Sequence, residues 1–122
     1  MPSRVAVAKE LSGLLKVMAH PDRIQIVQLL AVRGEHNVGS IAANLGLPAP
    51  RVSQHLAALK SLRLVEETPR AQERIYKLAS NYLATWLVEG VRFIAPSLGT
   101  VTDEQLADAR RLWLGAFAPE IH

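Results

Sequence analysis

The chain contains no cysteine among its 122 residues. Disulfide bonds, thiolate metal sites and cysteine nucleophiles are therefore excluded for this sequence. Aromatic residues are also scarce, at 5% of the sequence against 49% for all hydrophobic residues. A core with so few rings has to be built from Leu, Val, Ile and Ala, which favours packed helices.

Long apolar runs are missing as well. No stretch approaches the ~18 apolar residues that cross a bilayer, and the N-terminus has no signal-like apolar segment. We therefore expect a cytoplasmic protein without a membrane partner. Histidines are few and the acids fall mostly at predicted helix ends or in the strand region, so the pattern does not indicate an enzyme. The length predicts one domain, residues 1–122.

Hydrophobic periodicity and capping signals predict four helices in the first half of the chain. Pro21 starts the second of them, Asn37 can cap the third, and Gly46 ends it. Pro48 and Pro50 cannot continue the third helix, but they are tolerated at the start of the fourth. The four helices are expected at residues 5–18, 21–33, 38–45 and about 50–62.

The second half is predicted to hold a pair of strands and two more helices. The strands enclose a basic tip, and the helix after them is apolar nearly all round. A capping box from Thr102 to Gln105 starts the last helix. The expected elements are strands at 65–68 and 74–78 around a tip at 69–73, a helix at about 81–95, a linker at 96–101 and a helix at about 102–117.

This order predicts a mainly α fold with a small β-hairpin wing, the winged helix-turn-helix. In that fold the second helix of the pair, here about 50–62, enters the major groove of DNA, and the hairpin at about 65–78 forms the wing. On a helical wheel Val52, Leu56 and Leu59 fall together and would seat this recognition helix in the core. The outward face carries Gln54, Ala57, Ala58 and Ser61, flanked by Arg51 and Ser53.

This outward face has no acid and several small side chains, as expected of a surface that reads base edges. Gln54 can bond adenine through two hydrogen bonds, Arg51 can reach guanine or a phosphate, and Ser53 can contact either a base or a phosphate. The candidate DNA-binding residues are Arg51, Ser53, Gln54, His55, Lys60, Arg70 and Arg74.

Some of these assignments leave alternatives open. His55 sits between the buried stripe and the exposed face, so it either hydrogen-bonds locally or contacts a phosphate. Arg70 and Arg74 are either solvated charges or contacts to phosphates and the minor groove. No Asp or Glu occurs between Glu35 and Glu66, and this deficit favours the approach of a phosphate backbone.

A set of short motifs lies within residues 10–95: His20-Pro21-Asp22-Arg23, Leu45-Gly46-Leu47, Val52-Ser53-Gln54-His55-Leu56, Leu64-Val65 and Arg74-Ile75-Tyr76. In these motifs the chain resembles the ArsR/SmtB transcriptional repressors. The resemblance implies a homodimeric winged-helix repressor that leaves its operator when an inducer binds. It also implies that the first and fifth helices form the dimer interface. A twofold dimer would present its recognition helices to the half-sites of a palindromic operator.

The metal ligands of many such repressors are missing. Asn37 and Gly39 occupy the third-helix positions where the resemblance places cysteines, and no histidine occurs between His55 and His122. Zinc needs three or four converging ligands, whereas the remaining histidines lie on separate predicted elements. We therefore predict no metal site and no cofactor. A repressor that senses a metal through non-cysteine ligands is kept as an alternative.

A small-molecule effector and a protein partner are the other open alternatives. Trp86, Phe93, Trp113 and Phe117 all lie in the last third of the chain. They either line a cavity for an organic ligand or pack the last helix onto the dimer interface, and large rings favour packing. A winged helix used only for protein contacts would carry an acidic or apolar recognition face. The face at 50–62 is polar to basic, so duplex DNA is the favoured partner.

Overall fold

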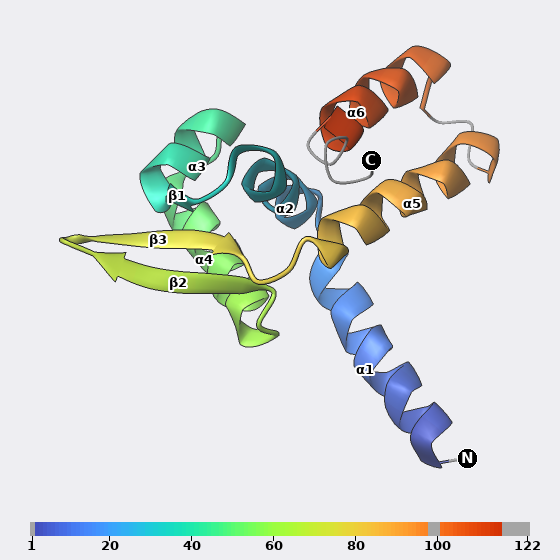
Figure 1. Ribbon diagram of the computed structural model, residues 1–122, viewed down its shortest axis with the longest axis horizontal. Helices are drawn as coiled ribbons and strands as arrows, with labels where there is room; N and C mark the ends of the chain where they lie inside the picture. Colours follow the sequence, from blue (N-terminus) through green and yellow to red (C-terminus); the bar gives the residue numbers. More distant parts are fainter. Residues whose placement is uncertain (1, 98–100, 116–122) are drawn as a thin grey trace.

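The computed structural model describes residues 2–97 and 101–115 as a mainly helical fold with one small sheet (Figure 1). None of the helices in these ranges is both long and apolar enough to span a lipid bilayer. The helices are α1 (Pro2–Met18), α2 (Pro21–Arg33), α3 (Val38–Leu45), α4 (Ala49–Ser61), α5 (Tyr82–Ser97) and α6 (Asp103–Gly115), and the strands are β1 (His36–Asn37), β2 (Val65–Arg70) and β3 (Glu73–Leu78).

The helix α2 stands at the centre of the molecule. It contacts α3, α4, α5 and α6 as well as β3. The sheet extends from this body on the side of α3 and α4, while α1 projects from it as an arm (Figure 1). The winged helix-turn-helix predicted from the element order is confirmed.

Local signals set the ends of the central helices. Asn37 Oδ1 accepts a hydrogen bond from Ser40 N (2.7 Å) and caps α3. Gly46 ends α3 in the left-handed conformation, with φ 66°. Pro48, with an extended backbone, then precedes α4. α3 has the predicted bounds, and α4 lies one residue earlier at each end than expected.

The C-terminus of α4 adopts a conformation that usually favours glycine. Arg63 has φ 59°, its N donates to Lys60 O (2.8 Å), and Leu64 N donates to Leu59 O (3.0 Å). These two hydrogen bonds make a Schellman motif, which satisfies carbonyls at the helix end. The motif turns the chain directly from α4 into β2.

The wing is an antiparallel sheet of three strands in the order β1-β3-β2. The predicted hairpin is present, but the tip predicted at 69–73 is wrong. Pro69 and Arg70 still pair with β3, so only Ala71 and Gln72 form the turn, and Ala71 has φ 57°. Pro69 is tolerated there because β2 is an edge strand, where no ladder hydrogen bond from its nitrogen is required.

The sequence pattern does not predict β1. In the structure His36 pairs with Tyr76 and Asn37 with Ile75, which adds a third strand to the hairpin. Two residues are too short to show the alternation that marks a strand in a sequence. This pairing fixes the N-terminus of α3 against the wing.

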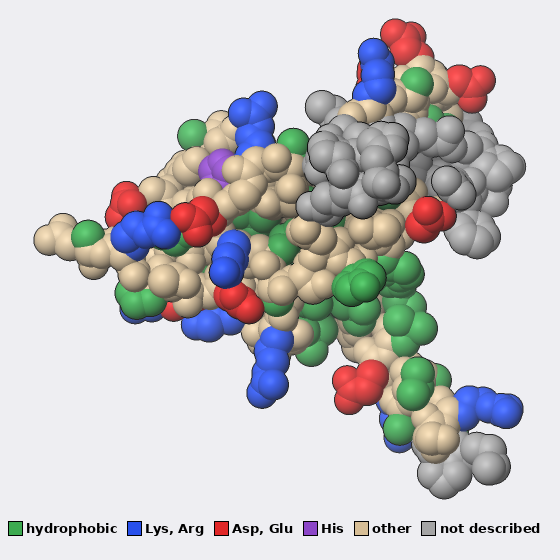
Figure 2. All heavy atoms as spheres, in the orientation of Figure 1, with side chains coloured by type: hydrophobic (Ala, Val, Ile, Leu, Met, Phe, Trp, Pro, Cys, Tyr) green, Lys and Arg blue, Asp and Glu red, His purple; other side chains and the backbone are tan. Residues whose placement is uncertain are grey.

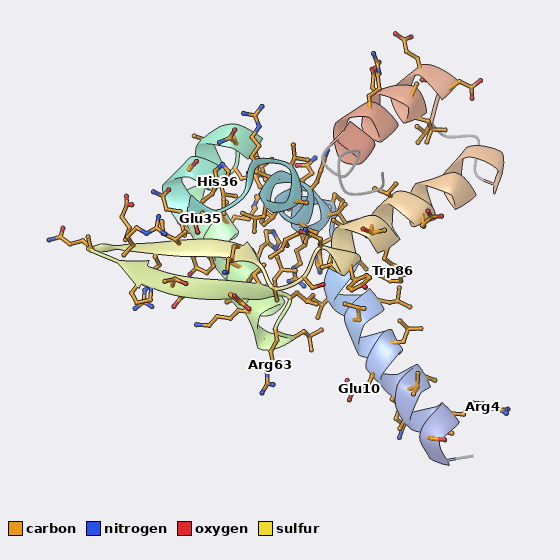
Figure 3. All side chains as sticks on the ribbon, viewed as in Figure 1. Arg4, Glu10, Glu35, His36, Arg63 and Trp86 are labelled. Carbon is orange, nitrogen blue, oxygen red and sulfur yellow. The ribbon has the colours of Figure 1, made fainter. Side chains whose placement is uncertain are left out.

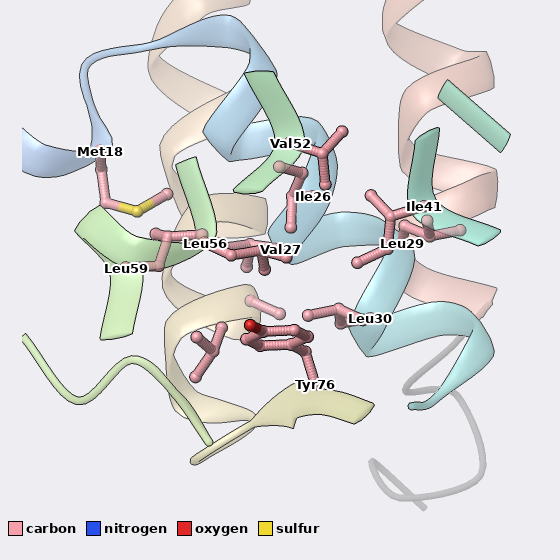
Figure 4. Packing of buried hydrophobic residues seen from close by; sticks show 12 residues of the cluster. Met18, Ile26, Val27, Leu29, Leu30, Ile41, Val52, Leu56, Leu59 and Tyr76 are labelled. Atoms are coloured by element: carbon pink, nitrogen blue, oxygen red, sulfur yellow. The ribbon is translucent and has the colours of Figure 1, made fainter. Parts of the chain in front are cut away.

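The core forms where α2, α3 and α4 meet the wing. Ile26 and Val27 of α2 are fully buried, as is Ile41 of α3. Figure 4 shows Leu56 facing Val27 across α4 and α2, with the ring of Tyr76 beside these aliphatic side chains. Tyr76 is the one aromatic residue in this cluster, as far as the structure describes the chain.

The last two helices differ from the prediction in their bounds. α5 continues through Pro96 to Ser97, so the linker predicted at 96–101 is wrong at its start. A proline so close to a helix end removes one hydrogen bond and leaves few later ones to disturb. The capping box is confirmed, because Gln105 N donates to Thr102 Oγ1 (3.1 Å) and Thr102 N to Gln105 Oε1 (2.9 Å). Phe117, at the predicted end, lies outside the described residues.

Candidate nucleic-acid interface

The predicted recognition helix α4 is held in the body by its apolar side. Val52, Leu56 and Leu59 are fully buried, as the helical wheel predicts. Spacings of three and four residues place these side chains along one stripe, which directs the other side of α4 to solvent. The structure therefore exposes a polar helix face directly beside the wing.

Three predicted site residues lie on this exposed face. Arg51, Ser53 and Gln54 are exposed. Within the part of the chain that the structure describes, their side chains make no hydrogen bond or ion pair. Their donors and acceptors are therefore free for a ligand.

His55 lies on the flank of α4 that faces α2. Arg23 Nε donates to its Nδ1 (3.1 Å), and its Nε2 lies 3.3 Å from Asp22 Oδ2. The ring is 13% exposed and both nitrogens are engaged within the protein. The structure thus supports the local-bonding interpretation of His55 and sets this residue apart from the three free side chains.

Lys60 and Arg74 meet at one carboxylate, that of Glu67 on β2. Arg74 Nη1 donates to Glu67 Oε1 (2.6 Å), and Lys60 Nζ lies 3.3 Å from the same oxygen. The hydroxyl of Tyr76 donates to Glu67 Oε2 (2.6 Å) from the buried side. The Glu67 side chain is only 13% exposed. Its contacts connect the end of α4 to both long strands of the wing.

Arg70 lies at the tip of the wing. Its Nη2 donates to Glu35 Oε1 (2.9 Å), and both side chains are exposed. Glu35 directly precedes β1 and points toward the wing (Figure 3). Each of the three cations predicted outside the main recognition face is therefore paired with an acid of the same chain.

Comparison with known proteins agrees with this geometry. Residues 20–67, which run from the start of α2 into β2, match the family described as "Bacterial regulatory protein, arsR family". The sequence is also 35% identical to the biofilm growth-associated repressor of Agrobacterium fabrum over 98 residues, which are 79% of this chain and 82% of that protein. The chain belongs to the ArsR family.

Two solved structures show the same fold at similar identity. HlyU from Vibrio cholerae matches with a TM-score of 0.66 at 30% identity, over 76% of this chain and 97% of HlyU. A homodimeric winged helix-turn-helix DNA-binding domain from Mycobacterium bovis matches with a TM-score of 0.65 at 29% identity, over 77% of this chain and 88% of that domain. This ArsR-family protein is a DNA-binding transcriptional regulator and not an enzyme.

The positions where the ArsR resemblance places cysteines hold Asn37 and Gly39 in this chain. Asn37 caps α3 and also donates to Glu73 Oε1 (3.0 Å) on the wing. Gly39 has no side chain. In the described part of the chain, no group of three or more His, Asp or Glu side chains is placed to hold a metal ion.

The Glu67 cluster is the feature of this ArsR-family surface that sequence reasoning does not find. The pKa of Glu67 is lowered from 4.5 to about 2. The hydrogen bond from Tyr76 is the largest cause, and Arg74 and Lys60 act in the same direction, whereas burial acts against them. Burial and the bond to Glu67 raise the pKa of Tyr76 to about 12, so its hydroxyl remains a donor at physiological pH. Glu67 and Tyr76 are direct cross-strand partners, and only the strand register could have revealed the pair.

Replacing Glu67 by glutamine is expected to make the stability of the fold depend less on pH in the acid range. The folded carboxyl binds a proton near pH 2 and the unfolded one near pH 4.5, so folding favours its charged form. The stability that Glu67 contributes is therefore complete above pH 4.5 and is lost as the pH falls toward 2. Thermal melts of Glu67→Gln should show a lower Tm than wild type at neutral pH and a smaller further loss across this window.

The neighbouring Glu66 supplies a matched control. It forms an exposed ion pair with Lys77 (3.6 Å), so Glu66→Gln should leave the profile close to that of the wild type. If Tm falls equally with decreasing pH in wild type and Glu67→Gln, the Glu67 contacts do not stabilise the fold.

Proposed function

We propose that this protein is a repressor that binds a palindromic operator as a homodimer, with α4 in the major groove and the wing against the backbone. The observation that carries this proposal is the exposed face of α4. Arg51, Ser53 and Gln54 project from a helix whose opposite side is fully buried, and their polar groups have no partner in the described residues. Free donors and acceptors on a rigid helix are what readout of base edges requires.

The wing and the end of α4 supply cations for phosphates. The side chains of Arg70 and Arg74 are 60% and 66% exposed although both are ion-paired. Exposed pairs such as Arg70–Glu35 contribute roughly 0–1 kcal/mol, so a DNA phosphate can take the place of the carboxylate. Arg63 adds a further exposed cation at the base of the wing, where its side chain projects away from the body (Figure 3).

Exposed apolar side chains on α1 and α5 support the homodimer. Val7, Leu11 and Leu15 lie on one side of α1 and are exposed, and at the start of α5 Tyr82 is 85% exposed. Figure 2 shows hydrophobic side chains gathered along α1 and at its junction with α5, whereas charged side chains alternate over the wing. A second copy would cover this surface, in agreement with the homodimeric relative from Mycobacterium bovis.

The same proposal places residues 1–122 in a single winged-helix domain that acts in the cytoplasm, where bacterial promoters lie. The contacts of α6 with α2 and α5 support its inclusion in that domain. The side chains of Phe93, Trp113 and Phe117 lie outside the described residues, so the packing predicted for them stays a prediction.

Gln54→Ala is expected to reduce discrimination between operator and altered operator by roughly 5- to 150-fold, because one bidentate base contact contributes about 1–3 kcal/mol. Fluorescence anisotropy on an operator selected by the wild-type protein from random duplexes, and on single-base variants of it, measures this ratio. The side chain of Gln54 is exposed, so its loss should leave Tm unchanged.

Arg70→Ala serves as the contrasting variant. It should weaken binding to all sequences by a similar factor and reduce the slope of log K against log salt by about 1. Gln25→Ala, an exposed glutamine on α2, should change neither quantity. If Gln54→Ala discriminates between duplexes as well as wild type, Gln54 does not read base edges. If wild type binds all duplexes with equal affinity, the protein is not a sequence-specific regulator.

A further inference from the structure

Arg23 connects the arm α1 to the recognition helix α4. It lies in the first turn of α2, and its guanidinium makes two separate donations. Nη1 donates to the carbonyl oxygen of Val17 in the last turn of α1 (2.9 Å), and Nε donates to Nδ1 of His55 on α4 (3.1 Å). One planar group thus contacts the proposed dimerisation helix and the proposed DNA-reading helix at once.

The contact to Val17 matters because α1 has little other support. The Val17 carbonyl is among the last four of α1, which have no partner within the helix. Only the C-terminal part of α1, through Leu14, Val17 and Met18, packs against the core, and the rest projects as an arm (Figure 1). A helix of this length extends about 25 Å, so a change of about 10° in its direction displaces the far end by about 4 Å.

The contact to His55 is fixed by chemistry and by a second residue. An arginine has no acceptor, so Nδ1 of His55 must accept the bond and Nε2 must carry the ring proton. That proton is then directed at Asp22 Oδ2, 3.3 Å away. Asp22 and Arg23 are adjacent on α2 and hold opposite edges of one half-buried ring. His55 directly follows Gln54 on α4, so this ring ties α2 to α4 next to the exposed face.

We propose that Arg23 is a positioning residue that sets the direction of α1 relative to α4, and thereby the spacing between the two recognition helices of the dimer. The inference rests on the proposed homodimer and adds a residue to its mechanism. Lysine cannot replace Arg23, since a single ammonium group does not provide two donors at fixed separation and angle. The half-site spacing of the operator is then a property of this bridge as well as of the dimer interface.

The experiment compares wild type with Arg23→Lys on a series of duplexes. The starting duplex is the operator selected by the wild-type protein, and its half-site separation is lengthened or shortened by one and two base pairs. Wild type should show a sharp optimum. Arg23→Lys should bind the optimal duplex about tenfold more weakly, as expected from losing one to two hydrogen bonds, and lose much less on the altered spacings, so that the preference flattens.

Two controls keep the test specific. Arg33→Lys alters the exposed arginine in the last turn of the same helix and should behave as wild type. Binding to a duplex with one half-site, and the dimer dissociation constant from sedimentation, should be unchanged in Arg23→Lys. If Arg23→Lys fails to fold, His55→Leu removes the α4 side of the bridge while leaving the Val17 contact, and it should flatten the preference in the same way.

The outcomes separate the two proposals. A variant that retains the wild-type spacing preference, with or without a uniform loss of affinity, overturns the role of Arg23 and leaves the homodimeric repressor intact. A wild-type protein that is monomeric, or that gains nothing from a second half-site, overturns the proposed function itself. A flattened preference with unchanged half-site affinity supports Arg23.

Discussion

Replacing Leu11 and Leu15 together by glutamate is expected to make the protein monomeric and to lower its affinity for a two-half-site operator by at least about 100-fold. The two side chains are 46% and 50% exposed on one side of α1, so the double variant should retain the fold of the isolated chain. In the dimer the same positions would be buried against a second copy. Burying unpaired carboxylates there would be strongly unfavourable.

The loss of affinity follows from the loss of a shared binding event. When one subunit of a dimer is bound, the other faces its half-site at a high effective concentration, and this advantage amounts to about 10²- to 10⁴-fold. A monomer retains the contacts of α4 and the wing but not this advantage. Sedimentation velocity measures the mass of the variant, and fluorescence anisotropy compares duplexes with one and two half-sites.

A control on the same helix isolates the apolar stripe from a general effect of charge. Ala6→Glu with Ser12→Glu adds the same charge to exposed positions of α1 outside the Val7, Leu11 and Leu15 stripe. This control should remain dimeric and bind the operator nearly as wild type, apart from a small electrostatic loss. A dimeric Leu11→Glu, Leu15→Glu variant would show that α1 does not form the interface.

Leu56→Ala is expected to reduce the free energy of unfolding by about 2–5 kcal/mol. Leu56 is fully buried where α4 meets α2, and alanine would leave a cavity in the contact that seats the recognition helix. Urea denaturation followed by circular dichroism measures the change. Operator binding should fall as well, because α4 loses the packing that orients Gln54.

Leu62 provides the comparison for this substitution. It lies just beyond the last residue of α4 and is exposed, so Leu62→Ala removes the same atoms without opening a cavity. Its cost should stay below about 1 kcal/mol. Similar losses for the two variants would mean that α4 is not seated through its Leu and Val stripe.

Much of the scaffold was predictable because its signals are local. The side chain of Asn37 caps the helix that follows it, and Gly46 takes up the left-handed turn that ends α3. The stripe of Val52, Leu56 and Leu59 follows from helix geometry alone, and it determines which side of α4 faces outward. The exposure of Gln54 was therefore readable from the sequence.

The parts of the sheet that the sequence pattern predicted wrongly, or not at all, share a different cause. β1 exists only because β3 is beside it, and the length of the hairpin depends on pairing between strands and not on turn residues alone. A proline at 69 suggested a loop, yet an edge strand accepts it. Strand pairing is a property of two segments at once, so a pattern along one segment does not reveal its extent.

The order of helices and strands follows from the sequence alone, and so does the face that the recognition helix turns to solvent. Both depend on neighbours within a few positions of each other. The partners of the charged and imidazole groups depend instead on the folded arrangement: Glu67 with Lys60 and Arg74, Glu35 with Arg70, and His55 with Arg23. Charges and ring nitrogens find partners by distance in space, and that distance is set by how distant segments pack.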